Sequence, residues 1–318
     1  MAYKTGSAKN ERDLLDILNT FLTTDPKLTA NGQAWTVLFD RTLPATATQM
    51  ERRQIMWKST GTGIGQDIYI GAETINDIAQ DTYNINFYGG TFFNESMATN
   101  PVFSNGIVNR SPGVALCGNG RDFTYHMVAD GRHFKLLTVI EKVCCTAYCG
   151  FVLPNVPPTE YPYPLCIAGC AEAGLTRFSA ANDEISSIAS ARNKNCWLLT
   201  PDQSWRDFVY SDGARGKNAD STKQGIHPIY SNAIANKDIL TKLAAINNHY
   251  PLTQVELYST AESSQGMNRW GAMDGIYWLP GIGTLALDTI KTKDGRKLIV
   301  FNDAYRVTTT SYFAMEIE

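Results

Sequence analysis

The sequence lacks an excess of charge of either sign. Its 28 lysine and arginine residues are balanced by 31 aspartate and glutamate residues, which gives a net charge of −3. A surface that binds nucleic acid, or a polybasic membrane anchor, needs a clear excess of positive charge. We therefore expect neither nucleic acid nor a membrane among the partners of this chain.

Long apolar runs are missing as well. The amino-terminal stretch MAYKTGSAKNERDLL has no apolar segment that could serve as a signal peptide. No later stretch reaches the roughly 20 apolar residues that a membrane span requires. These absences predict a protein that is made and kept in a cytoplasm-like compartment.

Recognisable catalytic and nucleotide-binding motifs are also absent. Residues 59–65 read STGTGIG, but no lysine follows the glycines and the next segment is strand-like, so a turn is expected rather than a phosphate loop. There is no Gly-x-Ser-x-Gly elbow, and the histidines do not have the spacing of metal ligands. The histidines are His126, His133, His227 and His249. We expect no enzyme activity, no cofactor and no metal.

The carboxylates leave one enzyme class open. Asp122, Asp130, Glu141 and Glu160 are single and scattered along the sequence. A glycosidase needs only two carboxylates that the fold brings together, and such a pair cannot be recognised from spacing.

Strand-like alternation dominates the residues that are present. Near the end of the sequence, apolar runs at 285–289 and 298–300 flank a polar link at 291–296 that contains Asp-Gly, a strong hairpin signal. Residues 312–318 alternate again, so we expect this end to lie within a sheet. The predicted fold class is mainly β, a β-sandwich or meander-rich body.

Other segments complete this prediction. Further strands are expected at 35–39, 54–58, 67–71, 83–88, 196–200 and 255–258, and a three-stranded meander at 123–153. Non-strand segments are expected as a helical or turn-like stretch at 72–80, a long loop at 91–117, an extended proline-rich segment at 154–164, a solvent loop at 212–225 and a helix at 235–246.

One amphipathic helix is predicted at residues 10–22. Its apolar stripe consists of Leu14, Leu15, Leu18, Phe21 and Leu22. Ser7 or Asn10 can cap the start of this helix, and Asp25-Pro26 ends it. The stripe either packs on the body of the chain or docks on a neighbouring subunit.

The domain prediction follows the second possibility. Residues 1–30 are a helical arm and residues 31–318 a β-rich body, with a boundary between two subdomains left open near 154–175. The predicted assembly interface is Leu14, Leu18, Phe21 and Leu22, and the loop at 91–117 is expected to meet neighbouring subunits too.

The cysteines have an unusual distribution. Five of the seven are Cys144, Cys145, Cys149, Cys166 and Cys170. Two Cys-x3-Cys pairs have a spacing close to that of zinc ligands. However, strand residues four positions apart lie roughly 13 Å from each other, too far to bind one ion. We predict small buried apolar side chains that bind no metal, with zinc and a disulfide as the alternatives.

Two stretches have a familiar look. They are residues 4–23, with Lys-Thr-Gly-Ser-Ala followed by the leucine-rich helix, and residues 274–278 (DGIYW) with 312–315 (YFAM). Together they resemble the virion structural proteins of tailed bacteriophages, in the group near the tail or baseplate. The resemblance implies a structural subunit of the virion, assembled in the host bacterial cytoplasm, that forms a homo-oligomer and binds other virion structural proteins.

The alternative is a carbohydrate-binding or glycan-cleaving protein used to recognise the host surface. Exposed aromatic rings would then serve as stacking platforms for sugars. The candidates are Trp205, Tyr210, Trp270 and Tyr277.

Overall fold

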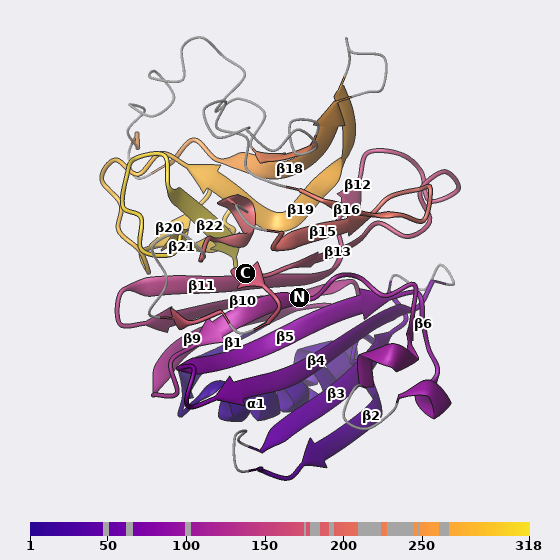
Figure 1. Cartoon of the computed structure of the whole chain (residues 1–318). Coiled ribbons are helices and arrows are strands. Elements are labelled where there is room, and N and C mark those ends of the chain that lie inside the picture. The colour runs from indigo at the N-terminus through magenta and orange to yellow at the C-terminus, as the bar shows by residue number, and fades with distance from the viewer. Residues whose placement is uncertain are drawn as a thin grey trace.

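The computed structural model describes residues 1–46, 51–61, 66–98, 103–174, 176–178, 185–190, 194–208, 224–227, 245–246, 249–260 and 267–318. Within these ranges the chain is mainly β, as predicted, and its sheets stack in three layers (Figure 1). The predicted loop at 212–225 and helix at 235–246 lie outside the described residues, apart from the last two residues of each. Among the described helices, none is long and apolar enough to cross a membrane.

Sheet A is the middle layer, and its described strands run antiparallel in the order β1-β9-β10-β11-β13-β15-β16. The strands are β1 (Ala2–Ala8), β9 (Phe123–Ala129), β10 (His133–Ile140), β11 (Val143–Phe151), β13 (Leu165–Ala168), β15 (Cys196–Leu199) and β16 (Trp205–Asp207). The meander predicted at 123–153 is confirmed as β9, β10 and β11. Strand β1 was not predicted.

Sheet B covers one face of sheet A, in the strand order β14-β8-β5-β4-β3-β2. The strands are β2 (Thr36–Leu43), β3 (Arg52–Ser59), β4 (Ile68–Asp77), β5 (Thr82–Gly90), β8 (Val114–Gly118) and β14 (Ala171–Glu172). A short ribbon of β6 (Phe92–Phe93) and β7 (Ile107–Val108) packs on its outer face, with the 3-10 turns η1 (Glu95–Met97) and η2 (Phe103–Gly106).

Sheet D covers the other face of sheet A, in the order β17-β18-β19-β22-β21-β20. The strands are β17 (Gln224–His227), β18 (Thr253–Thr260), β19 (Met267–Leu279), β20 (Thr289–Lys291), β21 (Lys297–Asn302) and β22 (Tyr312–Glu316). The predicted C-terminal hairpin turn and its second strand are confirmed as the β20–β21 connection and β21, but the first strand begins only at Thr289, so residues 285–288 of the expected run lie outside it. Strand β22 pairs with both β19 and β21, so this end of the sequence does lie within a sheet.

Two apolar cores separate the three layers. Alternate residues of the sheet A strands point to opposite sides, because successive side chains of a strand do so. On β10, Phe134 and Leu136 lie in the core shared with sheet B (the A–B core), whereas Leu137 lies in the core shared with sheet D (the A–D core). Both faces of the middle sheet are therefore buried.

Helix α1 (Glu11–Thr24) fills part of the A–B core, and a short helix, α2 (Pro26–Ala30), follows it. The Asn10 side chain caps α1 by accepting a 2.9 Å hydrogen bond from the backbone N–H of Asp13. Two side chains fix the helix to sheet B, since Trp57 Nε1 donates to Asn19 Oδ1 at 2.8 Å and Asn76 Nδ2 donates to Glu11 Oε1 at 2.8 Å. The predicted helix is thus confirmed, as part of the body.

Residues 1–30 do not form a separate arm. Strand β1 pairs with β9 along its whole length, from Ala2 opposite Ala129 to Ala8 opposite Phe123, and α1 continues from it into the A–B core. The segment 154–164 does not interrupt the middle sheet either, because β11 and β13 on its two sides are direct neighbours. It lies mostly outside strands, as its prolines predict, with only β12 (Leu153–Pro154) paired to β19.

Two local predictions are wrong. Residues 72–77 belong to β4, not to a helical or turn-like stretch, because all six pair with β5 and residues 72 and 73 also pair with β3; residues 78–80 form the turn that follows. Its polar residues are satisfied by other elements, as when Glu73 accepts from Arg52 at 2.7 Å. The segment 91–117 is not a plain loop, since it contains the β6–β7 ribbon and the buried strand β8.

Candidate functional site

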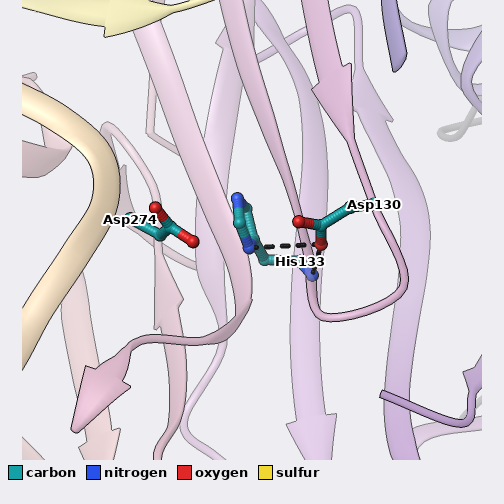
Figure 2. Close-up of side chains that lie close together, drawn as sticks. All are labelled: Asp130, His133 and Asp274. Carbon is teal, nitrogen blue, oxygen red and sulfur yellow. Dashed lines mark hydrogen bonds and ion pairs between the residues drawn. The ribbon is translucent and has the colours of Figure 1, made fainter. Parts of the chain in front are cut away.

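A cluster of charged side chains lies at one end of the A–D core (Figure 2). The turn between β9 and β10 supplies Asp130 and Arg132, β10 supplies His133 and Lys135, and β19 supplies Asp274. One ligand-type atom from each of Asp130, His133 and Asp274 lies within 4.8 Å of the other two. The fold therefore joins residues 144 positions apart (274 − 130) at a single place.

The β9–β10 turn is built by the Asp130 side chain. Its Oδ1 accepts from the backbone N–H groups of Arg132 at 2.7 Å and of His133 at 3.0 Å, as Asx turns do. The backbone N–H of Asp130 also donates to the carbonyl of His133 at 3.0 Å. These bonds hold the carboxylate beside the imidazole ring.

On the opposite side, Lys135 fixes the backbone of sheet D. Lys135 lies on a central strand and is 1% exposed. Its ammonium group donates to the carbonyl of Asp274 at 2.9 Å. Residue 275 is a glycine with φ +68, and a Cβ there would collide with Lys135 Nζ. The backbone conformation and the buried ammonium group therefore both favour glycine at 275.

The charges in the cluster balance. Asp130 and Asp274 offset Arg132 and Lys135, and the Arg132 guanidinium forms an ion pair with the Asp274 carboxylate. Burial raises the pKa of Asp130, but the neighbouring His133 and the two backbone N–H donors outweigh burial and leave the pKa lowered. Burial lowers the pKa of Lys135 to about 8, against the opposing attraction of Asp274 and Asp130.

His133 is the unusual member of the cluster. The side chain is fully buried, and its ring stacks on that of Tyr148, with 5.1 Å between the ring centroids and an interplanar angle of 8°. Neither ring nitrogen has a hydrogen-bond partner among the described residues, and Nδ1 lies 3.4 Å from Asp130 Oδ1. Burial lowers the pKa of His133 to about 4, so the ring is neutral at pH 7.

The predicted assembly interface lies elsewhere and is incorrect. Leu14, Leu18, Phe21 and Leu22 are each at most 2% exposed, in the A–B core of their own chain. Side chains that are already covered by the chain's own strands cannot bind a neighbouring subunit. The burial follows from the pairing of β1 with β9, which holds the start of the helix against the body.

The cysteines are distributed over both cores. All seven lie in the described part of the chain, buried and without a disulfide bond, as expected of small apolar side chains. Cys170 Sγ accepts from the backbone N–H of Cys117 at 3.1 Å, and Cys166 Sγ lies 3.9 Å from Cys196 Sγ. Cys145 and Cys149 share the A–B face of β11, and Cys144 lies on the other face.

The aromatic residues proposed as sugar platforms are engaged within the protein. Trp205 Nε1 donates to the carbonyl of Asn109 at 2.9 Å, Trp270 packs edge-on against Tyr161 at 6.3 Å, and the Tyr277 hydroxyl accepts from Arg296 at 2.6 Å. All three are half-buried, and Tyr210 lies outside the described residues.

An open hollow of about 550 Å³ lies at the edge of sheet D, next to the β20–β21 hairpin. Tyr250, Lys291, Lys293 and Arg296 contribute to its lining. Arg296 is paired with Asp294 and Glu316, at 2.8 Å and 2.9 Å. Lys291 and Lys293 are exposed and form no ion pair within the described ranges, so this hollow is weakly basic.

Sequence reasoning identified parts of the charged cluster but not the cluster itself. In the sequence, Asp130 is one of four scattered carboxylates and His133 is one of four histidines without metal-ligand spacing, so neither residue indicates that the two side chains meet. Asp274 had no signal of its own. The spacing Asp130-x-x-His133 across a tight turn was the one local pattern that could have pointed to the site.

Comparison with models of protein families gives no match to this chain, and comparison with curated protein sequences gives none either.

Proposed function

We propose that the chain is a structural subunit of a bacteriophage virion, in the tail or baseplate region, that acts by protein–protein assembly and not by catalysis. The resemblance of residues 4–23 and 274–278 to such proteins motivates the proposal. A mainly β body of three layers is compatible with it. Its partners would be further copies of this chain and other virion structural proteins.

The observation that carries the proposal is the ribbon on the outer face of sheet B. Phe92 and Val108 are cross-strand partners in β6 and β7, and they are 52% and 44% exposed. Met97, on the η1 turn of the same segment, is 52% exposed. Large apolar side chains gathered on one exposed segment are typical of surfaces that bind other proteins.

The ribbon is held firmly enough to serve as a contact. Phe93, Phe103 and Ile107 anchor it in a small apolar cluster on sheet B, and Phe39 of β2 packs against Phe93 at 5.9 Å. The exposed side chains thus sit on a fixed base, which lowers the entropy cost of association. Covering the three exposed side chains contributes a few kcal/mol, roughly 1.5–3 for each fully buried one, so a stable contact needs additional area around them.

The test is the mass of the protein in solution. Light scattering during gel filtration should show an oligomer for the wild-type chain and a monomer for Phe92→Ser with Val108→Ser, at unchanged circular dichroism. Leu285→Ser with Val307→Ser is the matched control, because these residues are 69% and 71% exposed but lie away from the ribbon. A wild-type chain that stays monomeric at all concentrations would contradict the homo-oligomer.

The virion location needs its own measurement. An antibody against the chain should label the tail end of phage particles in electron micrographs. Labelling of the producing cells without labelling of particles would contradict a virion protein.

A second candidate, binding of an acidic glycan, is favoured by the basic hollow at the edge of sheet D. Exposed Lys291 and Lys293 could meet the carboxylates of a uronic-acid polysaccharide, with Tyr250 beside them. Alginate binding that is lost in Lys291→Ala with Lys293→Ala, and kept in Lys142→Ala, would support this candidate. A turnover assay on the same polysaccharide separates binding from cleavage.

A further inference from the structure

The charged cluster at the end of the A–D core has the donor set of a metal site. Asp130 and Asp274 offer carboxylate oxygens and His133 offers a ring nitrogen, all within 4.8 Å of one another. Figure 2 shows the imidazole between the two carboxylates, with Asp274 approaching from sheet D. One nitrogen and two oxygens suit borderline divalent ions such as Zn²⁺ and Mn²⁺.

The buried imidazole points independently to a ligand. His133 is 0% exposed, and both ring nitrogens lack a hydrogen-bond partner among the described residues. A buried polar group without a partner costs about 1–3 kcal/mol, so its presence needs an explanation. Stacking on Tyr148 fixes the plane of the ring, as metal-binding histidines require.

The distance between His133 and Asp130 fits two ligands of one ion better than a direct hydrogen bond. Nδ1 of His133 lies 3.4 Å from Oδ1 of Asp130 without forming a hydrogen bond. Two ligands that bind one tetrahedral ion at about 2.0–2.2 Å lie about 3.3–3.6 Å from each other. Asp130 and His133 are therefore already spaced as neighbouring ligands, and the Asp274 ligand atom lies within 4.8 Å of both.

Arg132 is the group with which an ion must compete. Its guanidinium pairs with the Asp274 carboxylate, and its side chain is 30% exposed, so it can turn outward into solvent. Lys135 binds the Asp274 carbonyl from a buried position and does not need to move. An ion that replaces Arg132 at Asp274 would link sheet D to the β9–β10 turn of sheet A.

We infer that Asp130, His133 and Asp274 bind one divalent cation of the Mn²⁺ and Zn²⁺ class, in exchange with the Arg132 guanidinium at Asp274. This site joins two layers of the fold. It does not depend on the proposed virion function, because it lies in the A–D core and not on the β6–β7 ribbon.

The test uses Mn²⁺, because the chain has seven cysteines that could bind zinc on their own. The full-length protein is treated with a chelator, dialysed and titrated with Mn²⁺, and free Mn²⁺ is followed by electron paramagnetic resonance. We expect one saturable Mn²⁺ per chain. A parallel Co²⁺ titration should give a visible spectrum without the intense thiolate band, which excludes the cysteines as ligands.

Substitutions at the partly exposed carboxylates test the ligands. Asp274→Asn and Asp130→Asn should each weaken Mn²⁺ binding by about tenfold or more, since even groups that only orient a ligand have that effect. Arg132→Ala should tighten binding, because it removes the competing cation. Asp294→Asn, at an exposed position in the β20–β21 turn, is the matched control and should bind Mn²⁺ as the wild type does.

Thermal unfolding with and without Mn²⁺ gives a second readout. The wild type and Arg132→Ala should be stabilised by the ion, and Asp274→Asn should not, provided that circular dichroism shows it folded. Absence of saturable binding to the wild type would overturn the proposal. Binding that Asp130→Asn and Asp274→Asn both leave unchanged would mean an adventitious ion only, and an Arg132→Ala variant with unchanged affinity would overturn the exchange.

Discussion

The two cores of this protein share the middle sheet but differ in kind. In the A–B core, Phe134 of β10 is surrounded edge-on by Trp35, Trp57 and Phe87, at centroid distances of 5.6, 6.1 and 5.8 Å. In the A–D core, its sequence neighbours His133 and Lys135 bring an imidazole and an ammonium group beside apolar side chains such as Leu137, and they join the charged cluster there.

This difference shows how one strand can serve two purposes. A strand between two layers has two faces, and each face is chosen separately because alternate residues point to opposite sides. Burying polar groups costs free energy unless they are paired, so the face with His133 and Lys135 gives up stability that the Phe134 face provides. Sites of function are expected where local rules of burial are broken in this way.

The largest effect is expected from breaking the A–B core through its helix. Leu18→Asp with Phe21→Asp should unfold the chain, because both side chains are at most 2% exposed in that core. Each change loses roughly 1.5–3 kcal/mol of apolar burial and adds the larger cost of a buried carboxylate, which together approach the total stability of a typical domain. Circular dichroism and gel filtration of the purified variant report the outcome.

The matched control for the helix is Leu285→Asp with Val307→Asp, at positions that are 69% and 71% exposed. This control should remain folded. A soluble, folded Leu18→Asp with Phe21→Asp monomer would restore the separate helical arm that the structure contradicts.

The next effect compares the two faces of β10 directly. Phe134→Ala should reduce the free energy of unfolding by about 3–5 kcal/mol, because it opens a cavity among aromatic rings. Lys135→Met should cost less, about 1–3 kcal/mol, since it leaves the Asp274 carbonyl without its donor while Arg132 still pairs with the Asp274 carboxylate. Urea unfolding of both variants under one set of conditions measures the difference. A larger loss for Lys135→Met would mean that the charged cluster contributes more to stability than the aromatic one.

A pH-dependent effect is expected at the rim of the A–B core. Asp207 lies at the end of β16, directly opposite Trp197, and burial raises the pKa of its carboxyl to about 7. The folded chain then holds a proton that the unfolded chain releases near pH 4, so stability from this group is present at acid pH and lost as pH rises through about 7. Asp207→Asn should flatten this dependence and be more stable than the wild type at pH 8, by roughly 1–3 kcal/mol.

Chemical unfolding between pH 4 and pH 8 tests this prediction. The two proteins should have similar stability near pH 4, diverge progressively between about pH 4 and pH 7, and keep a constant difference at higher pH. Parallel curves over the whole range would show that Asp207 is ionised in the folded chain.

The smallest effect is expected at the surface of sheet D. Arg269 pairs with Glu256 across β18 and β19, but half of its side chain is exposed to solvent. Exposed ion pairs contribute about 0–1 kcal/mol, and salt screens them. Arg269→Ala should therefore change the midpoint of unfolding only slightly, and less at high salt. A loss of unfolding free energy as large as that of Phe134→Ala would mean that this ion pair contributes as much to stability as a buried side chain.

The strands that the sequence predicts are those whose own residues alternate between apolar and polar and end at a recognisable turn. The strands of the β9–β10–β11 meander alternate clearly, and Asp-Gly marks both the β9–β10 turn and the β20–β21 turn. Strand β1, with the sequence AYKTGSA, has no such pattern and becomes a strand through its pairing with β9. Strand β4 has no strand pattern in its polar half, where Glu73 bonds to Arg52 on β3 and Asn76 donates to Glu11 on α1.

The charged cluster could not be predicted because its two halves are far apart in the sequence. Asp130 and His133 are three residues apart and belong to one turn, but Asp274 meets them only after sheet D has packed on sheet A. Spacing rules detect ligands that lie on one local element. Burial of His133 depends in the same way on Tyr148 and on the layer above it, which no local pattern shows.

The position of β22 has a consequence for the order of folding. Residues 312–316 fill the middle of sheet D, between β19 and β21, so the two halves of this sheet cannot join until residue 316 has been synthesised. Likewise, β1 of sheet A cannot pair until residues 123–129 of β9 have been synthesised. Contacts between such distant segments slow folding, because the loop between them must close before any pairing compensates. Until then the open edges of β19 and β21 are exposed, and a cell making this chain must keep them from pairing with other molecules.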